Sequence, residues 1–294
     1  MPPTRRLLLV HAHPDDESIL TGGTIAVHRA RGDRVAVVTC TRGEQGEVIP
    51  PELAHLDADH DDTLGEYRVG ELAAALAAAG YPEHHWLGGQ GRYRDSGMAG
   101  TPSCARSDCF WRADLLDAAR DLVPIIREVR PQVLVIENPA GGYRHPDHIQ
   151  SHRVATYAAT LAAVDRYAPE LGEPWRIAKT YWNALPRSVI EKGLAAIGGR
   201  SHEPFQLARI EQLLRVVDDA TVTTEVDATA YAEAKRAAMA AHRTQLTVDG
   251  EDGYALSNSL AQPLTAVEHF QLAAGRLGPV GPHGLEADLF AGID

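Results

Sequence analysis

The chain has 294 residues, which at roughly 150 residues per domain corresponds to one large or two small domains. Hydrophobic residues make up 44% and charged residues 23%, which is typical of a soluble globular chain and excludes a fibrous or disordered protein. The formal charge of −12 repels phosphate backbones and anionic lipid surfaces, so we expect neither nucleic acid nor a membrane as a partner.

The chain has only 3 cysteines beside 14 histidines. Cys40, Cys104 and Cys109 form no C-x-x-C pair, which argues against a disulfide framework and against a thiolate zinc site. Cys104 and Cys109 could pair or stay as free thiols. The apolar stretch at residues 7–10 is too short for a signal peptide, and no apolar run approaches the length of a membrane span. We therefore expect a cytoplasmic protein.

Apolar periodicity and turn residues predict alternating strands and helices. In chain order we expect a strand at 6–10, a helix at 17–31, a strand at 34–40, a long alanine-rich helix at 59–79, a strand at 85–87, a helix at 113–129, a strand at 132–136, a helix at 147–167, a strand at 177–184 and a helix at 228–241. This order predicts an α/β fold with a doubly wound, mostly parallel sheet.

The pattern becomes less regular beyond residue 186, where glycine and polar stretches interrupt it. We interpret residues 1–185 as the core domain and residues 186–294 as an elaborated C-terminal subdomain packed on it. Because no linker marks the boundary, the two parts can equally form one continuous domain.

Two short histidine motifs each follow a predicted strand. The first is H-A-H-P-D-D-E at 11–17, and the second is G-G-Y-R-H-P-D-H at 141–148. Ligands bind at the carboxyl ends of the strands in an open parallel sheet, and the first and fourth strands are commonly neighbours. We therefore expect the two motifs to face each other across one crevice.

Histidine and carboxylate side chains of the two motifs predict a metal site. His145 and His148 are at i, i+3 and can project to one side, as can His13 and Asp16 if the chain turns there. Two histidines and one carboxylate match catalytic zinc with an open position for water, but they also match the facial triad of iron oxygenases. The spare Asp15 favours hydrolysis, because a carboxylate beside a metal-bound water is a general-base arrangement.

The A-H-P-D-D-E stretch with the later H-P-D-H resembles the PIG-L or LmbE-like family of zinc-dependent N-deacetylases, which have a Rossmann-like fold. Further segments carry the likeness over most of the chain: T-C-T-R-G-E-Q-G-E at 39–47, Y-R-x-G-E-L at 67–72, L-G-G-Q-G-R-Y-R-D-S-G-M-A-G at 87–100, E-P-W at 173–175 and A-H-R-T-Q at 241–245. Within the family they are most similar to the enzymes that deacetylate N-acetylglucosaminyl-inositol in mycothiol biosynthesis.

The resemblance implies roles for the residues of the first motif and for the metal. His13, Asp16 and His148 would be the ligands of Zn²⁺, with Fe²⁺ as an alternative in the same site. Asp15 would be the general base that takes a proton from the attacking water.

The residues around His148 would complete the catalytic machinery. Tyr143 or His145 would stabilise the oxyanion, and a protonated His145 would deliver a proton to the departing amine. Asp147 would orient His145 or a metal ligand.

For substrate binding, the resemblance points to Arg68, Asp95 and Met98. A carboxylate and an arginine suit a polyol ligand, because together they accept and donate several hydrogen bonds. The chain departs from the family at Asn138, which stands where an acidic residue is common before the proline, and at Leu20, which replaces a small polar residue.

Two further histidines are candidates for indirect support of the site. His11 precedes the first motif, and His242 lies in the A-H-R-T-Q stretch.

The sequence therefore predicts a zinc-dependent hydrolase that removes acetate from the N-acetylglucosamine unit of a glucosaminyl-inositol, with a small amino-sugar as its partner. A mycothiol S-conjugate amidase of the same family would share every catalytic residue. A non-haem iron oxygenase and a non-catalytic sugar-binding protein are the alternatives from other classes.

Overall fold

The computed structural model of the protein describes residues 4–293. Its strands form where apolar and β-branched runs lie between turn residues. They are β1 (Arg6–His11), β2 (Arg34–Thr39), β3 (Glu83–Trp86), β4 (Val133–Ile136), β5 (Lys179–Pro186), β6 (Gln206–Leu207), β7 (Val216–Val217), β8 (Thr224–Asp227), β9 (Leu246–Asp249), β10 (Gly253–Leu256), β11 (Leu260–Pro263) and β12 (Val267–Ala274). The α-helices are α1 (Asp16–Ala30), α2 (Leu64–Ala78), α3 (Leu115–Val129), α4 (Gly141–Arg144), α5 (Pro146–Ala162), α6 (Arg187–Ile197) and α7 (Ala232–Ala241).

The main sheet has the strand order β3-β2-β1-β4-β5-β12-β8, and β7 pairs with β5. The strands from β3 to β5 all run parallel, and the chain reverses its winding direction between β1 and β4, which are neighbours. This order is that of the Rossmann fold, whose ligands bind at the point of reversal. The predicted α/β class with a mostly parallel, doubly wound sheet is confirmed.

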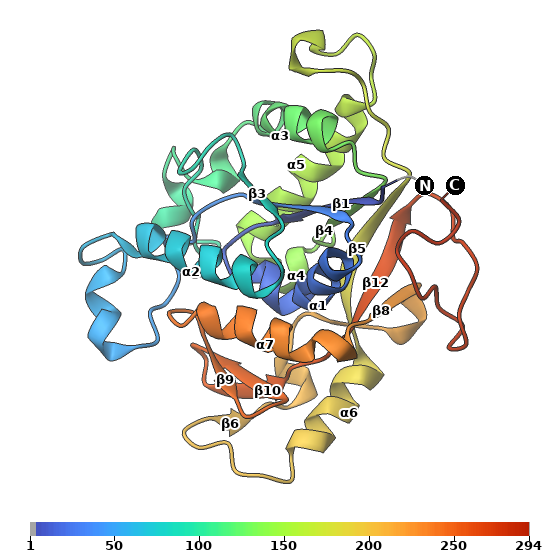
Figure 1. Cartoon of the computed structure of the whole chain (residues 1–294). Coiled ribbons are helices and arrows are strands. Elements are labelled where there is room, and N and C mark those ends of the chain that lie inside the picture. The colour runs from blue at the N-terminus through green and yellow to red at the C-terminus, as the bar shows by residue number, and fades with distance from the viewer. Residues whose placement is uncertain (1–3, 294) are drawn as a thin grey trace.

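Helices cover both faces of this sheet (Figure 1). Alternate residues of β1, such as Leu8 and Val10, pack with α3 and α5, whereas Leu7 and Leu9 pack on the side of α1, α2 and α7. Because both faces of the strands are buried, their sequences are apolar throughout instead of alternating. The two cores hold the strand ends, and therefore the loops that follow them, in fixed positions.

The C-terminal third contributes to the main sheet as well as forming a smaller one. Strand β12 pairs antiparallel with β5 and with β8, whereas β6, β11, β10 and β9 form a separate four-stranded sheet next to α6 and α7 (Figure 1). The division at residues 185/186 stays a prediction.

Two predicted helices differ from the structure by five residues at one end, and the helix expected from residue 228 begins at Ala232. The helix expected from residue 59 begins at Leu64, because Asp57 accepts hydrogen bonds from the Asp59 amide and the His60 ring, and such local bonds replace helical ones. The helix expected to reach residue 167 ends at Ala162, where a turn begins.

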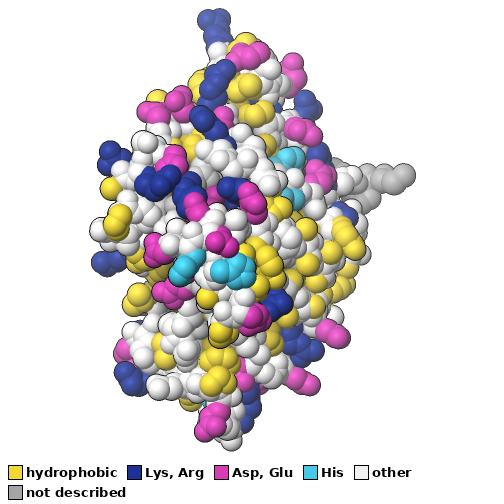
Figure 2. All heavy atoms as spheres, turned by 90° about the vertical axis from the view of Figure 1, so that its left-hand side faces the viewer, with side chains coloured by type: hydrophobic (Ala, Val, Ile, Leu, Met, Phe, Trp, Pro, Cys, Tyr) yellow, Lys and Arg dark blue, Asp and Glu magenta, His cyan; other side chains and the backbone are white. Residues whose placement is uncertain are grey.

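Three expectations from the composition concern the surface charges, the helices and the cysteines. Acidic and basic side chains are intermixed on the face in Figure 2. None of the described helices is both long and apolar enough to pass through a bilayer. Cys40, Cys104 and Cys109 are all free thiols.

A buried ion pair ties the C-terminal segment to the sheet. Glu286 accepts hydrogen bonds from Lys179 Nζ at 2.6 Å, the Tyr181 hydroxyl at 2.7 Å and the Thr224 hydroxyl at 2.8 Å. Burial works to raise the pKa of Glu286, but Lys179 and the other donors outweigh it and lower this pKa. The carboxylate therefore stabilises the fold while it is ionised.

Glu286→Gln is expected to destabilise the fold by about 3–5 kcal/mol at pH 7, because it leaves the Lys179 charge buried without a partner. A carboxylate whose pKa is lower in the native state than in the unfolded state stabilises the native state fully at pH values above its unfolded pKa of about 4.3. This contribution is lost as the pH falls through the pKa of the native state. The difference from the wild type should therefore shrink on acidification, as urea unfolding at several pH values would measure. Glu83→Gln, at the exposed pair with Arg34, is the control and should cost less than about 1 kcal/mol. Equal effects of the two substitutions would contradict this interpretation.

Candidate metal centre and active site

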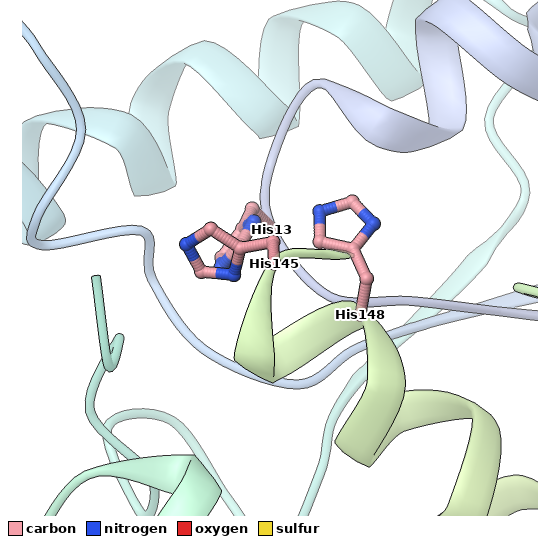
Figure 3. Close-up of side chains that lie close together, drawn as sticks. All are labelled: His13, His145 and His148. Atoms are coloured by element: carbon pink, nitrogen blue, oxygen red, sulfur yellow. The ribbon is translucent and has the colours of Figure 1, made fainter. Parts of the chain in front are cut away.

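The two histidine motifs meet at the carboxyl ends of the neighbouring strands β1 and β4. Pro146 is the first residue of α5, and His145 caps this helix by accepting a hydrogen bond from the Asp147 amide at Nδ1, 3.2 Å away. The ring of His13 lies 4.8 Å from that of His145 and 5.1 Å from that of His148 (Figure 3). The predicted convergence of the motifs is confirmed.

Asp16 lies close to both His13 and His148, which makes these residues candidate ligands of one metal ion. Asp16 Oδ2 is 3.4 Å from His148 Nε2 and 3.8 Å from His13 Nδ1, and all three residues are buried. Donor atoms bound to a tetrahedral zinc at about 2.1 Å lie about 3.4 Å apart, so these distances suit such an ion. Among the described residues, His148 Nε2 has no hydrogen-bond partner, as expected of a nitrogen that serves as a ligand. These side chains therefore fit a metal.

His145 is a further candidate ligand. Nitrogen atoms of His13, His145 and His148 all lie within 4.8 Å of one another. The assignment of His13, Asp16 and His148 as the ligand set therefore stays a prediction.

Asp147 contacts the ring of His13. Its Oδ2 atom is 3.2 Å from His13 Nε2 and accepts a hydrogen bond from the Ser96 amide at 2.9 Å. An imidazole that donates from Nε2 to this carboxylate presents Nδ1 toward Asp16. Asp147 thus contacts His13, a candidate metal ligand, through its side chain and His145 through its amide, and its expected role in orienting His145 or a ligand stays a prediction.

Glu137 was not predicted as a site residue, yet it lies at the other ring nitrogen of His148. Glu137 Oε1 is 3.4 Å from His148 Nδ1, and the carboxylate is fully buried directly after β4. Because Nδ1 faces Glu137, Nε2 is directed away from it and is free for a metal. Only its place at a strand end could have pointed to it, because the comparison with the family drew attention to Asn138 instead.

Arg215 was also missed, because it comes from the irregular C-terminal third. Its Nη2 atom donates to Asp16 Oδ1 at 3.1 Å, and its Nη1 atom is 3.8 Å from Glu137 Oε2. The guanidinium also lies over the ring of Tyr143, 4.8 Å from its centroid. Nothing in the spacing of the sequence links this arginine to the motifs.

Asp15 has a strained backbone and a mostly buried carboxylate. Its φ of 118° is unusual for a residue with a side chain, and it immediately precedes α1. Burial raises its pKa to about 6, although Arg68 acts in the opposite direction. A carboxylate with a pKa near neutrality is suited to accept and release a proton.

Glu17 and His242 hold the Asp15 loop. Glu17 Oε2 accepts a hydrogen bond from the Asp15 amide at 2.9 Å, and Glu17 Oε1 lies 2.8 Å from His242 Nε2. The A-H-R-T-Q stretch therefore reaches the first motif through a buried contact. His11, in contrast, lies against the Thr21 hydroxyl, 3.0 Å away.

Arg68 is almost fully buried on α2 and contacts the loop that carries Asp15. It donates to Asp15 Oδ2 at 3.0 Å, to the Gly43 carbonyl at 2.8 Å and to the Pro14 carbonyl. Through these contacts Arg68 holds the first motif in place. Its predicted contact with substrate stays a prediction.

The other two expected substrate residues differ in their surroundings. Asp95 is buried, accepts hydrogen bonds from the Gln45 and Gly97 amides, and lies 3.5 Å from His13 Nε2. Burial acts to raise its pKa, but His13 outweighs this and the pKa is lowered. Met98 is 47% exposed, so its side chain is accessible to a ligand.

His145 and Tyr143 lie beside His148. Burial and then the neighbouring His13 lower the pKa of His145 to about 3, so its imidazole is neutral near pH 7, which differs from the protonated form that we expected. Because its Nδ1 accepts from the Asp147 amide, its proton is on Nε2. Burial raises the pKa of Tyr143, whose ring is 5.1 Å from that of His148, and its hydroxyl stays protonated.

The fold and this cluster define an α/β protein with a buried candidate metal centre at the carboxyl ends of its parallel strands. Residues 8–159 match the PIG-L family, described as GlcNAc-PI de-N-acetylase, and this match covers more than half of the chain. The chain belongs to the PIG-L family, as its motifs predicted.

A relative from Streptomyces avermitilis matches over nearly its whole length. It is 56% identical over 295 residues, which cover 99% of this chain and 98% of the relative, and it is named 1D-myo-inositol 2-acetamido-2-deoxy-alpha-D-glucopyranoside deacetylase.

Two solved structures are similar in fold. N,N'-diacetylchitobiose deacetylase from Pyrococcus horikoshii has a TM-score of 0.56 at 18% identity, over 82% of this chain and 71% of that one. The 4-carboxy-2-hydroxymuconate hydratase from Pseudomonas putida has a TM-score of 0.59 at 19% identity, over 94% and 99% of the two chains. Because one fold carries a deacetylase and a hydratase, the fold alone does not define the reaction.

Proposed function

We propose that the protein is a metal-dependent amide hydrolase that removes acetate from the N-acetylglucosamine unit of an N-acetylglucosaminyl-inositol, the mycothiol precursor. The observation that carries this proposal is Asp15, whose mostly buried carboxylate is held by Arg68 and lies next in the chain to the candidate ligand Asp16. The Streptomyces relative that matches almost end to end supports the choice of substrate.

Zn²⁺ is the metal that we propose for His13, Asp16 and His148, with Fe²⁺ as an alternative. Nitrogen and oxygen donors at these distances suit zinc, and three protein ligands would leave a position for water. Bound there, zinc would lower the pKa of that water and polarise the amide carbonyl.

Asp15 would accept a proton from the attacking water at its carboxylate. Arg68 donates to this carboxylate and Glu17 holds the Asp15 backbone amide, so little reorganisation would be needed. Once protonated, Asp15 can return the proton to the departing amine. The neutral imidazole of His145 is a poor acid for this step.

His145 Nε2–H and the Tyr143 hydroxyl would donate hydrogen bonds to the developing oxyanion. Both groups are held beside His148 as neutral donors. Asp95 and the accessible Met98 are the proposed contacts for the sugar, in the loop that also supplies Ser96 to Asp147.

The test is incubation of the zinc-loaded protein with N-acetylglucosaminyl-inositol and, separately, with a mycothiol S-conjugate, while free amine and acetate are quantified. Acetate release from the first substrate, lost on chelation and restored by zinc, is the expected result. Preferential turnover of the conjugate would favour the amidase instead. Oxygen uptake that requires iron would indicate an oxygenase, and sugar binding without turnover would indicate a binding protein.

Arg68→Met is expected to lower kcat by about 10–100-fold while KM changes less than about threefold, because the arginine holds the Asp15 loop. Steady-state kinetics on N-acetylglucosaminyl-inositol would measure both constants. Arg92→Met, at an exposed arginine 4.0 Å from Asp121, is the control. A large rise in KM at unchanged kcat would instead support the substrate contact expected from the sequence.

A further inference from the structure

Asp16, Glu137 and His148 form a second group that could hold a cation. Their ligand atoms lie within 4.8 Å of one another, and all three side chains are buried. The group shares Asp16 and His148 with the proposed zinc site but includes Glu137, which lies at His148 Nδ1 rather than at Nε2. The imidazole of His148 therefore has a candidate cation position beside each of its two ring nitrogens.

The guanidinium of Arg215 contacts all three members of this second group. Its Nη2 atom is 3.1 Å from Asp16 Oδ1 and 3.4 Å from His148 Nδ1, and its Nη1 atom is 3.8 Å from Glu137 Oε2. Two buried carboxylates at this spacing need a positive charge, because burial strongly disfavours an unpaired charge. Arg215 supplies that charge from the chain itself.

We propose that Arg215 is a built-in cation that occupies the position of a second divalent metal ion and so keeps the centre mononuclear. This inference rests on the metal centre of the proposed function and adds the reason why that centre takes one ion. The guanidinium holds Asp16 by Oδ1, which leaves Oδ2 for the zinc position.

An arginine at this position also covers Nδ1 of His148, which lies 3.4 Å from Arg215 Nη2. A metal ion bound at Nδ1 would take the lone pair of this nitrogen and the position that faces Glu137. The guanidinium balances the charge of Glu137 from the same side of the ring. His148 then keeps one orientation, with Nε2 directed to the zinc position.

The test is the number of zinc ions bound by the full chain when Zn²⁺ alone is the probe. Wild type, Arg215→Met and the double variant Arg215→Met/Glu137→Gln would be stripped with a chelator, dialysed against excess Zn²⁺ and measured for metal per chain. We expect the zinc content to double from wild type to Arg215→Met and to return to the wild-type value in the double variant. Arg120→Met, which removes an exposed arginine paired with Glu170, is the matched control and should bind as the wild type does.

An Arg215→Met chain with the zinc content of the wild type would overturn the proposal. Thermal melting gives a second readout, because an ion that binds only the native state stabilises it. Excess zinc should raise the Tm of Arg215→Met more than that of the wild type, and equal shifts would contradict the proposal even if the variant folds poorly without metal. Wild-type protein that binds no zinc would instead refute the proposed metal centre, so the two failures are distinguishable.

Discussion

Replacement of Asp15 by asparagine is expected to lower kcat by about a hundred- to ten-thousand-fold, because an amide of the same shape cannot accept the proton of the attacking water. The side chain keeps an oxygen that can accept from Arg68, so the loop should stay in place. Zinc content should also be unchanged, since Asp15 is not among the proposed ligands. Acetate release and metal content, measured on the same preparation, would check both expectations.

Asp59→Asn is the matched control, because Asp59 is exposed and lies far along the chain from both motifs. It should leave kcat within about twofold of the wild type, as surface substitutions usually do. Undiminished acetate release by zinc-loaded Asp15→Asn would show that another group takes the proton.

His148→Ala is expected to weaken zinc binding by more than about a hundredfold and to abolish acetate release at limiting zinc. Loss of a residue that only orients a ligand costs about 10–100-fold in metal affinity, so loss of the ligand itself should exceed this range. Competition with a chromophoric chelator would measure the affinity.

Exposed His55 provides the control substitution, His55→Ala, which should keep the zinc affinity of the wild type. Free imidazole should partly restore zinc binding to His148→Ala, because the truncated side chain leaves space beside Asp16. If His148→Ala kept full affinity, the ion would be held by another set that includes His145.

The sequence was sufficient to predict the parallel sheet and the meeting of the two motifs. Both depend on local signals, namely apolar runs at β1 and β4 and a proline at the first position of α5. Once these strands are neighbours in the sheet, His13 and His148 have to come together. Short-range patterns and one rule of topology therefore account for most of the centre.

The other residues of the candidate site could not be predicted, because their positions depend on contacts between distant parts of the chain. Arg215 precedes a two-residue strand in a segment without clear periodicity, and its approach to Asp16 follows only from tertiary packing. The neutral state of His145 depends on burial and on His13, neither of which a motif specifies. Glu137 is named by no motif, and its contact with His148 requires the fold.

The position of β12 between β5 and β8 has a consequence for the order in which the protein can fold during synthesis. Strand β5 ends at Pro186, but its partner β12 begins at Val267, so one edge of the growing sheet stays unpaired while the intervening chain emerges from the ribosome. An unpaired edge is open to pairing with other chains, which exposes the growing chain to aggregation during this interval. Arg215 and His242 are made within the same interval, so the candidate metal centre and its supports can be completed only after this part of the chain has been synthesised.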